Sequence, residues 1–168
     1  KFSADSAVIA AGRVGIAVAL HKARQLLDQN RANNVVIVGT DSLLEWQTLR
    51  AFDSQGRLCS NRNSNGFIPG QAAGAVLLGP YDAAAGMHVE GIGFGEEPAP
   101  IDSEQPSRAD GLTAAIKAAF VDANVPTFEP DFRISGISGE QFYFKEAAVA
   151  ASPNDPAAGR SACRSNAS

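Results

Sequence analysis

Cysteine is scarce in this chain, which carries only Cys59 and Cys163 and has no C-x-x-C pair. Two isolated thiols do not make a disulfide framework, so a small disulfide-stapled scaffold is excluded. A thiol also needs a neighbouring base or a helix N-terminus to act as a nucleophile, and neither cysteine has a base beside it in sequence. Both cysteines are therefore predicted to be incidental.

Excess charge of one sign is missing too. Lysine and arginine number 14 against 18 acidic residues, the net charge is −4, and no block of like charge occurs. This pattern predicts no nucleic-acid partner and no anionic membrane surface. The two histidines, His21 and His88, have no ligand partner at metal-binding spacing, so neither a metal site nor a bound cofactor is predicted.

Long apolar runs are absent as well, because Arg13, His21 and Lys22 interrupt the longest of them. No segment is predicted to cross a bilayer. No basic-then-apolar leader follows Lys1, so we expect a cytoplasmic protein. A first residue other than Met indicates a piece of something longer.

What is present is an ordinary globular composition, 45% hydrophobic and 19% charged, with 16 glycines. Hydrophobic periodicity predicts helices and buried strands in alternation, which is typical of an α/β fold with a mixed sheet covered by helices. Four helices are predicted, at 15–27, over a segment that carries Leu44 to Phe52, at 107–124 and at 140–151. Four strands are predicted, at 35–39, 73–78, 87–94 and 132–137.

Local signals refine these bounds. Asp41 or Ser42 can cap the second helix, Ser107-x-x-Asp110 resembles a capping box for the third, and Asn124 with Pro126 should stop it. Residues 54–65 are polar and predicted to form a surface loop, and Pro98 and Pro100 mark an exposed crossing. The tail 152–168 is small and polar, and is expected to be loose.

Two familiar motifs are incomplete. The glycines of Gly91-Ile-Gly93-Phe-Gly95 start like a dinucleotide loop, but Glu96 places a carboxylate where a pyrophosphate would approach. The stretch from Gly136 to Glu140 resembles a hydrolase elbow around Ser138, but its last glycine is missing. A glycine-rich strand end and a helix cap explain these two stretches better.

A more specific motif lies at residues 65–78, which read Asn-Gly-Phe-Ile-Pro-Gly-Gln-Ala-Ala-Gly-Ala-Val-Leu-Leu. This stretch resembles the Asp-Gly-Phe-Val-x-Gly-Glu-Gly-Ala-Gly signature of the β-ketoacyl synthases, and the order of elements from Gly12 to Ala151 is similar to that family. The resemblance implies a thiolase-like fold with a mixed central sheet and helices on both faces. Residues 1–151 would be a partial domain, with 1–97 ending the N-terminal half and 107–151 starting the C-terminal half. The segments 35–38, 75–78 and 89–92 would then be neighbouring strands of one sheet.

The family's chemistry does not carry over with the fold. Its nucleophile is a cysteine in Cys-x-x-Gly at the start of a buried helix, where the helix dipole lowers the thiol pKa. Here the matching segment is 12–15, and Gly12 stands in the place of the cysteine, or Arg13 if the match slips by one residue.

The family's histidine motif is not retained either. Ser135 takes the place of the first histidine and Glu140 that of the motif's proline, whereas Glu146 retains the family glutamate. The motif that holds the second histidine is absent.

Three readings follow from this resemblance to an acyltransferase family of fatty acid or polyketide biosynthesis. The first is a condensing-enzyme homologue without condensing activity, an acyl-binding or pairing subunit. The second is a serine-dependent acyltransferase or hydrolase that uses Ser135 or Ser138. The third is an incomplete chain of an active 3-oxoacyl synthase. The resemblance implies an acyl-carrier protein or acyl-CoA thioester as partner. It also implies a homodimer, or a heterodimer with a related ketosynthase, that pairs through residues 6–10.

Overall fold

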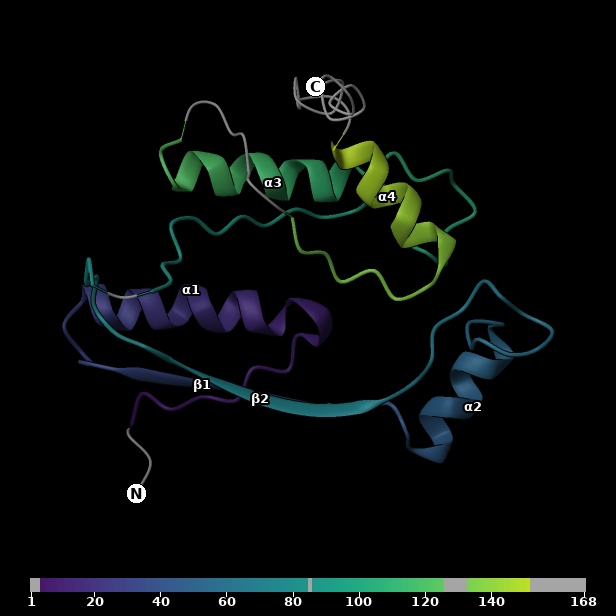
Figure 1. Ribbon diagram of the computed structural model, residues 1–168, viewed down its shortest axis with the longest axis horizontal. Coiled ribbons are helices and arrows are strands. Elements are labelled where there is room, and N and C mark those ends of the chain that lie inside the picture. The colour runs from purple at the N-terminus through teal and green to yellow at the C-terminus, as the bar shows by residue number, and fades with distance from the viewer. Residues whose placement is uncertain (1–3, 85, 126–132, 152–168) are drawn as a thin grey trace, which may run out of the picture. The chain divides into compact units, whose positions relative to one another are not determined.

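The computed structural model describes residues 4–84, 86–125 and 133–151, and it divides into two compact units (Figure 1). Unit 1 is formed by Lys1–Leu43 and Gly70–His88, and unit 2 by Leu44–Pro69 and Val89–Ser168. Each unit is considered by itself below. Both helices and strands occur among the described residues, so the α/β class is confirmed.

Unit 1 is a helix packed on a two-stranded sheet. A short 3₁₀ turn, η1 (Gly12–Val14), leads into α1 (Gly15–Asp28), followed by β1 (Val35–Ser42) and β2 (Gln71–Leu78). The two strands are antiparallel, with Val35 opposite Leu78 and Ser42 opposite Gln71. The helix and both strands lie where the hydrophobic pattern placed them, and the predicted neighbours 35–38 and 75–78 do pair.

The core of unit 1 lies between α1 and one face of β1. Ala23 and Ile37 are buried, and the Ile16 Cδ1 atom lies 3.4 Å from the position of a Cβ on Gly39. The other face of β1 is open, because Val36 and Val38 are 61% and 66% exposed. The continuous apolar run of β1 predicted burial on both faces, and the described residues cover only one.

Unit 2 holds the other three helices, α2 (Trp46–Ser54), α3 (Asp110–Asp122) and α4 (Gln141–Ala151). The predicted last helix is confirmed. The strand predicted at 132–137 is not formed over residues 133–137, and Phe132 lies outside the described residues. The tail 152–168 and Cys163 also lie outside them. Pro98 and Pro100 are exposed, as the sequence predicted.

The strand predicted at 87–94 is wrong, because the segment packs along a helix and joins no sheet in the described residues. Figure 1 shows the chain running beside α3. A Cβ on Gly91, Gly93 or Gly95 would lie about 2 Å from a helix carbonyl oxygen, the shortest separation being 1.9 Å at Gly93. Glycines two apart on an extended chain meet helix residues four apart, because the two repeats have similar lengths of about 6–7 Å. The alternating glycines therefore serve this close backbone approach.

The helix starts also differ from the predictions. Ser107 and Asp110 form no capping box; α3 begins at Asp110, and its first-turn N–H of Gly111 donates to Glu97 Oε2 at 3.0 Å. Asp41 and Ser42 belong to β1 rather than capping α2. Both cap predictions were therefore wrong. The start of α3 finds its acceptor on Glu97, which is distant in sequence, and no side chain caps the start of α2.

The helix ends follow local sequence. Asn30, Gly56 and Asn124 come directly after the C-caps of α1, α2 and α3, with φ of 53°, 65° and 55°. In each case two backbone hydrogen bonds form the Schellman motif that closes the helix. After α1, for example, Arg31 N donates to Leu26 O at 2.9 Å and Asn30 N donates to Leu27 O at 3.0 Å. The predicted stop at Asn124 is therefore confirmed.

Across the described residues, no helix combines the length and apolarity that crossing a membrane would require.

Candidate functional site

The position where the family resemblance places a nucleophile is occupied by a glycine in a special conformation. Gly12 opens the η1 turn before α1, has a φ of +53°, and is exposed. A Cβ added to it would have nothing within 4 Å, apart from its chain neighbours. A helix start with open space before it is suited to a nucleophile, but Gly12 supplies no side chain.

The predicted residues Ser135, Ser138 and Glu146 all lie in unit 2, whereas Gly12 lies in unit 1. Ser135 is exposed and Glu146 is half-buried on α4. Ser138 is half-buried, and its hydroxyl donates to Glu140 Oε2 at 3.2 Å. The hydroxyl of Ser138 is therefore held by a carboxylate two residues along the chain.

The most strongly organised charges of unit 2 are Arg57 and Glu140, which lie 83 residues apart in sequence. Arg57 Nε donates to Glu140 Oε1 at 2.8 Å, and Arg57 Nη2 donates to Oε2 at 3.2 Å. The Arg57 and Glu140 side chains are only 20% and 4% exposed. Paired donors that match a carboxylate fix its orientation as well as its charge.

Aromatic rings surround the guanidinium of this pair. Its central carbon lies 5.2 Å from the ring centre of Phe52 and 6.0 Å from that of Phe67, and the two rings meet edge to face. The hydrogen bonds to Glu140 raise the pKa of Arg57, against the lowering effect of burial. Arg57 is thus held as a permanent cation beside a pair of aromatic rings.

The family-like motif meets the start of α4 beside this ion pair. Asn65 Oδ1 accepts a hydrogen bond from Gln141 N, the first residue of α4, at 2.7 Å. A Cβ on Gly139, whose φ is +98°, would lie 2.7 Å from Gly66 O. Because only glycine tolerates both the positive φ and this close approach, Gly139 is what allows the two backbones to touch.

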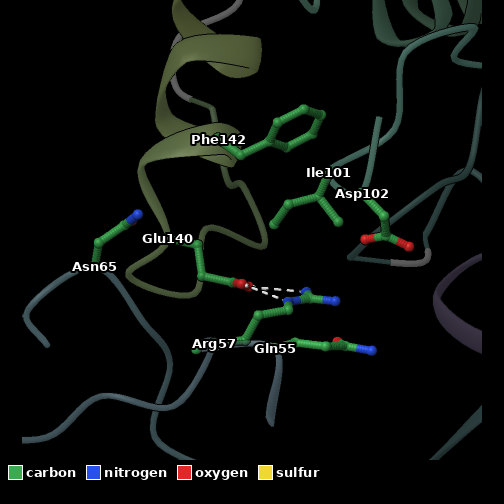
Figure 2. A pocket seen from close by; sticks show the side chains of 8 residues that line it. Gln55, Arg57, Asn65, Ile101, Asp102, Glu140 and Phe142 are labelled. Carbon is green, nitrogen blue, oxygen red and sulfur yellow. Dashed lines mark hydrogen bonds and ion pairs between the residues drawn. The ribbon is translucent and has the colours of Figure 1, made fainter. Parts of the chain in front are cut away.

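A hollow of about 500 Å³ lies over the Arg57–Glu140 pair (Figure 2). Gln55, Asn65 and Asp102 contribute polar groups to its lining, and Ile101 and Phe142 contribute apolar ones. Because the Glu140 carboxylate accepts from Arg57 and Ser138, it is not a free general base. The hollow therefore has polar walls but no activated nucleophile.

The remaining candidates form no reactive cluster. Cys59 is a free, exposed thiol. His21 is in hydrogen-bond contact with the Gln25 side chain at 3.1 Å, and the His88 ring contacts the Tyr81 ring at a tilt of 37°, with ring centres 4.8 Å apart. Within 4–84, 86–125 and 133–151, no three His, Cys, Asp or Glu side chains gather as metal ligands would.

Comparison with known proteins gives one family match. Residues 7–84 match the family model of the beta-ketoacyl synthase N-terminal domain. This match is consistent with a partial member of the thiolase-like β-ketoacyl synthase superfamily. The matched stretch includes Gly12 and the motif at 65–74, and it stops well before Ser135. A search of curated proteins found no match.

The matched stretch contains some of the residues named above and not others: Gly12 and Arg57 lie inside it, and Glu140 lies beyond it. Gly12 lies inside the matched ketoacyl synthase segment. Ser135 and Glu146 lie beyond it, so their assignment to the family's histidine and glutamate positions stays a prediction. Arg57 and Glu140 carry no signal in spacing or composition, because their contact is set by folding across 83 residues.

Proposed function

We propose that this chain is a condensing-enzyme homologue of thiolase-like fold that performs no thiol-based condensation and serves as an acyl-binding or pairing subunit. The observation that carries the proposal is Gly12 at the start of α1, inside the matched segment. Ketoacyl condensation requires a covalent acyl intermediate, and a residue without a side chain cannot form one. Loss of a covalent nucleophile costs on the order of a million-fold in rate in well-studied enzymes.

The serines of unit 2 support the same conclusion. Serine attacks a thioester only when a neighbouring base takes its proton. The carboxylate beside Ser138 accepts two hydrogen bonds from Arg57, so its charge is compensated and both of its oxygens are already engaged. A neutral Ser135 hydroxyl could donate to an oxyanion, but it could not replace an imidazole as acid or base at neutral pH.

A pairing role is supported by apolar surface at the N-terminal segment. Val8 is 98% exposed, in the stretch 6–10 that we predicted to be a pairing strand and that forms no strand in the structure. Among the described residues no large side chain is fully buried, whereas a self-sufficient domain normally buries several. The proposed partner is a second copy or a related active ketosynthase in the cytoplasm, with an acyl-carrier protein or acyl-CoA as the acyl source.

The direct test is acyl transfer followed by intact mass. The chain in a Cys59→Ser/Cys163→Ser background is incubated with acyl-CoA or acyl-carrier protein, and we expect no adduct. The matched variant Gly12→Cys in the same background should gain a thioester if α1 begins at the family's nucleophile site. An ester on Ser135 or Ser138, or decarboxylation of a malonyl thioester above background, would refute the proposal and favour a serine-dependent acyltransferase or hydrolase.

The pairing role has its own measurement. Light scattering at increasing concentration should show a dimer, or a heterodimer when a related ketosynthase is added. Val8→Lys should weaken it, because a charge on the pairing strand blocks edge-to-edge association. A clean monomer at high concentration, alone and with the ketosynthase, would remove this part of the proposal.

A further inference from the structure

Asn65 and Gly66 form the only Asn-Gly step in the amino-acid sequence. A backbone nitrogen that follows asparagine can attack the side-chain amide carbon, and glycine hinders this approach least because it has no Cβ. The packing of unit 2 requires that glycine, since a Cβ on Gly66 would lie 2.6 Å from Cys59 N and 2.8 Å from Arg57 O. The fold therefore imposes here the dipeptide in which an asparagine side chain is chemically least stable.

The groups that would react are available for reaction in the fold. Asn65 is exposed, so its amide nitrogen can leave into water as ammonia. Among the described residues no acceptor is recorded for the Gly66 N–H, so the attacking nitrogen is not held in a hydrogen bond. The backbone on either side is fixed, because Asn65 N donates to Asn63 Oδ1 at 3.1 Å and Phe67 N donates to Arg57 O at 3.0 Å.

The start of α4 activates the asparagine side chain. Gln141 N, in the first residue of α4, donates to Asn65 Oδ1 at 2.7 Å, and Figure 2 shows Asn65 beside the segment that carries Glu140. Attack on the amide carbon moves negative charge onto Oδ1. A backbone N–H at a helix N-terminus stabilises such a developing oxyanion more than it stabilises the neutral amide, so this contact lowers the barrier.

We propose that Asn65 is a self-modification site, at which the folded chain converts this asparagine to aspartate. The Gly66 nitrogen bonds to the side-chain carbon of Asn65, the bond from that carbon to the amide nitrogen breaks, and water carries the Gly66 proton to the departing ammonia. Water then opens the cyclic imide at the side-chain carbon, which restores the Gly66 N–H and leaves a carboxylate. The net change replaces ammonia by water and needs no oxidant or reductant.

The surroundings of Gly66 decide which way the imide opens. Opening at the main-chain carbonyl would give isoaspartate, which lengthens the backbone by an additional carbon. That length would disrupt the hydrogen bonds that Phe67 makes with the backbone of Arg57 and Cys59, at 3.0 and 2.9 Å. Opening at the side-chain carbon keeps the original backbone. The folded chain should therefore yield mainly aspartate.

The product places a negative charge where the helix favours one. A carboxylate at residue 65 still accepts from Gln141 N, and the hydrogen bond becomes charge-assisted at the positive end of α4. The new charge also joins the wall of the hollow over Arg57 and Glu140. Conversion should therefore strengthen the contact between the 54–65 loop and α4. The site uses no residue of unit 1 and no acyl chemistry, so it can hold while the proposed function fails.

The test incubates the full chain at neutral pH and follows every asparagine by peptide mapping with mass spectrometry. Asn65 should convert first, seen as the mass change of an amide replaced by an acid, while Asn61 and Asn63 in the same loop stay unchanged. Conversion should be faster in the folded chain than in a matched sample unfolded in urea. Fragmentation that separates aspartate from isoaspartate should find mainly aspartate in the folded chain.

Two variants test the role of α4. Gln141→Pro removes the N–H, and proline is well tolerated at the first residue of a helix, so conversion of Asn65 should slow about five-fold or more. Asn65→Asp imitates the product and should slow amide exchange at Gln141 about three-fold or more, because its hydrogen bond is charge-assisted. The comparison of folded and urea-unfolded chains still decides the matter if Gln141→Pro fails to fold.

Three results would overturn the proposal. The first is an Asn65 that keeps its amide in the folded chain and loses it in urea, since α4 would then protect the side chain. The second is conversion at an equal or higher rate in folded Gln141→Pro. The third is isoaspartate as the main product of the folded chain.

Discussion

Removing the carboxylate of Glu140 should destabilise unit 2 strongly. Among the charged side chains whose contacts are described, we expect its loss to have the largest effect on the free energy of unfolding. Glu140 is 4% exposed and accepts two hydrogen bonds from Arg57 and one from Ser138. Glu140→Ala would leave the Arg57 guanidinium, itself 20% exposed, without its partner. The variant therefore combines loss of the bonds with an uncompensated, mostly buried cation.

The magnitude follows from the geometry. Breaking a buried ion pair by removing one partner costs about 3–5 kcal/mol. Because a fifth of the Arg57 side chain reaches solvent, which screens the residual charge, we expect a smaller cost than this, about 2–3 kcal/mol for Glu140→Ala. Glu140→Gln keeps the size and one acceptor, and should cost about 1–2 kcal/mol.

Equilibrium unfolding in urea, followed by circular dichroism, measures these differences. A double-mutant cycle with Arg57→Met isolates the coupling, which should be about 2 kcal/mol for two charge-assisted hydrogen bonds of unequal length. The double variant Arg57→Met/Glu140→Leu should be more stable than Glu140→Ala alone, since it leaves no buried charge unpaired. Since the pKa of Arg57 is raised, its contribution to stability is fully present below the pKa of the unfolded state and is lost as the pH rises through the pKa of the folded state, in strongly alkaline solution.

The reasoning is refuted if Glu140→Ala and Glu140→Gln both lie within about 0.5 kcal/mol of the original chain, the range of ordinary surface substitutions. It is also refuted if the apolar double variant loses more unfolding free energy than its two single variants lose together. The two side chains would then not act as a pair.

Two further predictions concern packing around α3. Gly93→Ala should lower the free energy of unfolding in urea by about 2–4 kcal/mol, since its methyl group would enter the helix backbone. Its control is Gly86→Ala, whose added methyl group would have nothing within 4 Å and should change stability by less than about 1 kcal/mol. Glu97→Ala should cost about 1 kcal/mol and speed amide exchange at Gly111, because it removes the acceptor at the start of α3. Exposed Glu96→Ala is its control and should be nearly neutral, and equal losses in the two glutamate variants would contradict the capping role.

Features of the chain that depend on residues close in sequence were predictable. Helical spacing placed α1 and α4, continuous apolar runs placed β1 and β2, and Asn124 marked the end of α3. These signals are local because helix periodicity and helix closure involve residues within a few positions of one another. The motif at 65–78 likewise led to the family whose N-terminal domain model matches residues 7–84.

What only the tertiary structure decided is which distant segments meet. The glycines of 91–95 have the composition of a strand end, yet the approach of α3 turns them into a helix-packing surface. The start of α3 is satisfied by Glu97 rather than by Ser107, and Arg57 finds Glu140 across 83 residues. The sequence by itself determined α1, α4, β1 and β2, the resemblance to the β-ketoacyl synthases and the absence of a side chain at Gly12. Folding alone determined the ion pair and the acceptor at the start of α3, because each depends on the neighbours that the chain brings together in space, which no local pattern encodes.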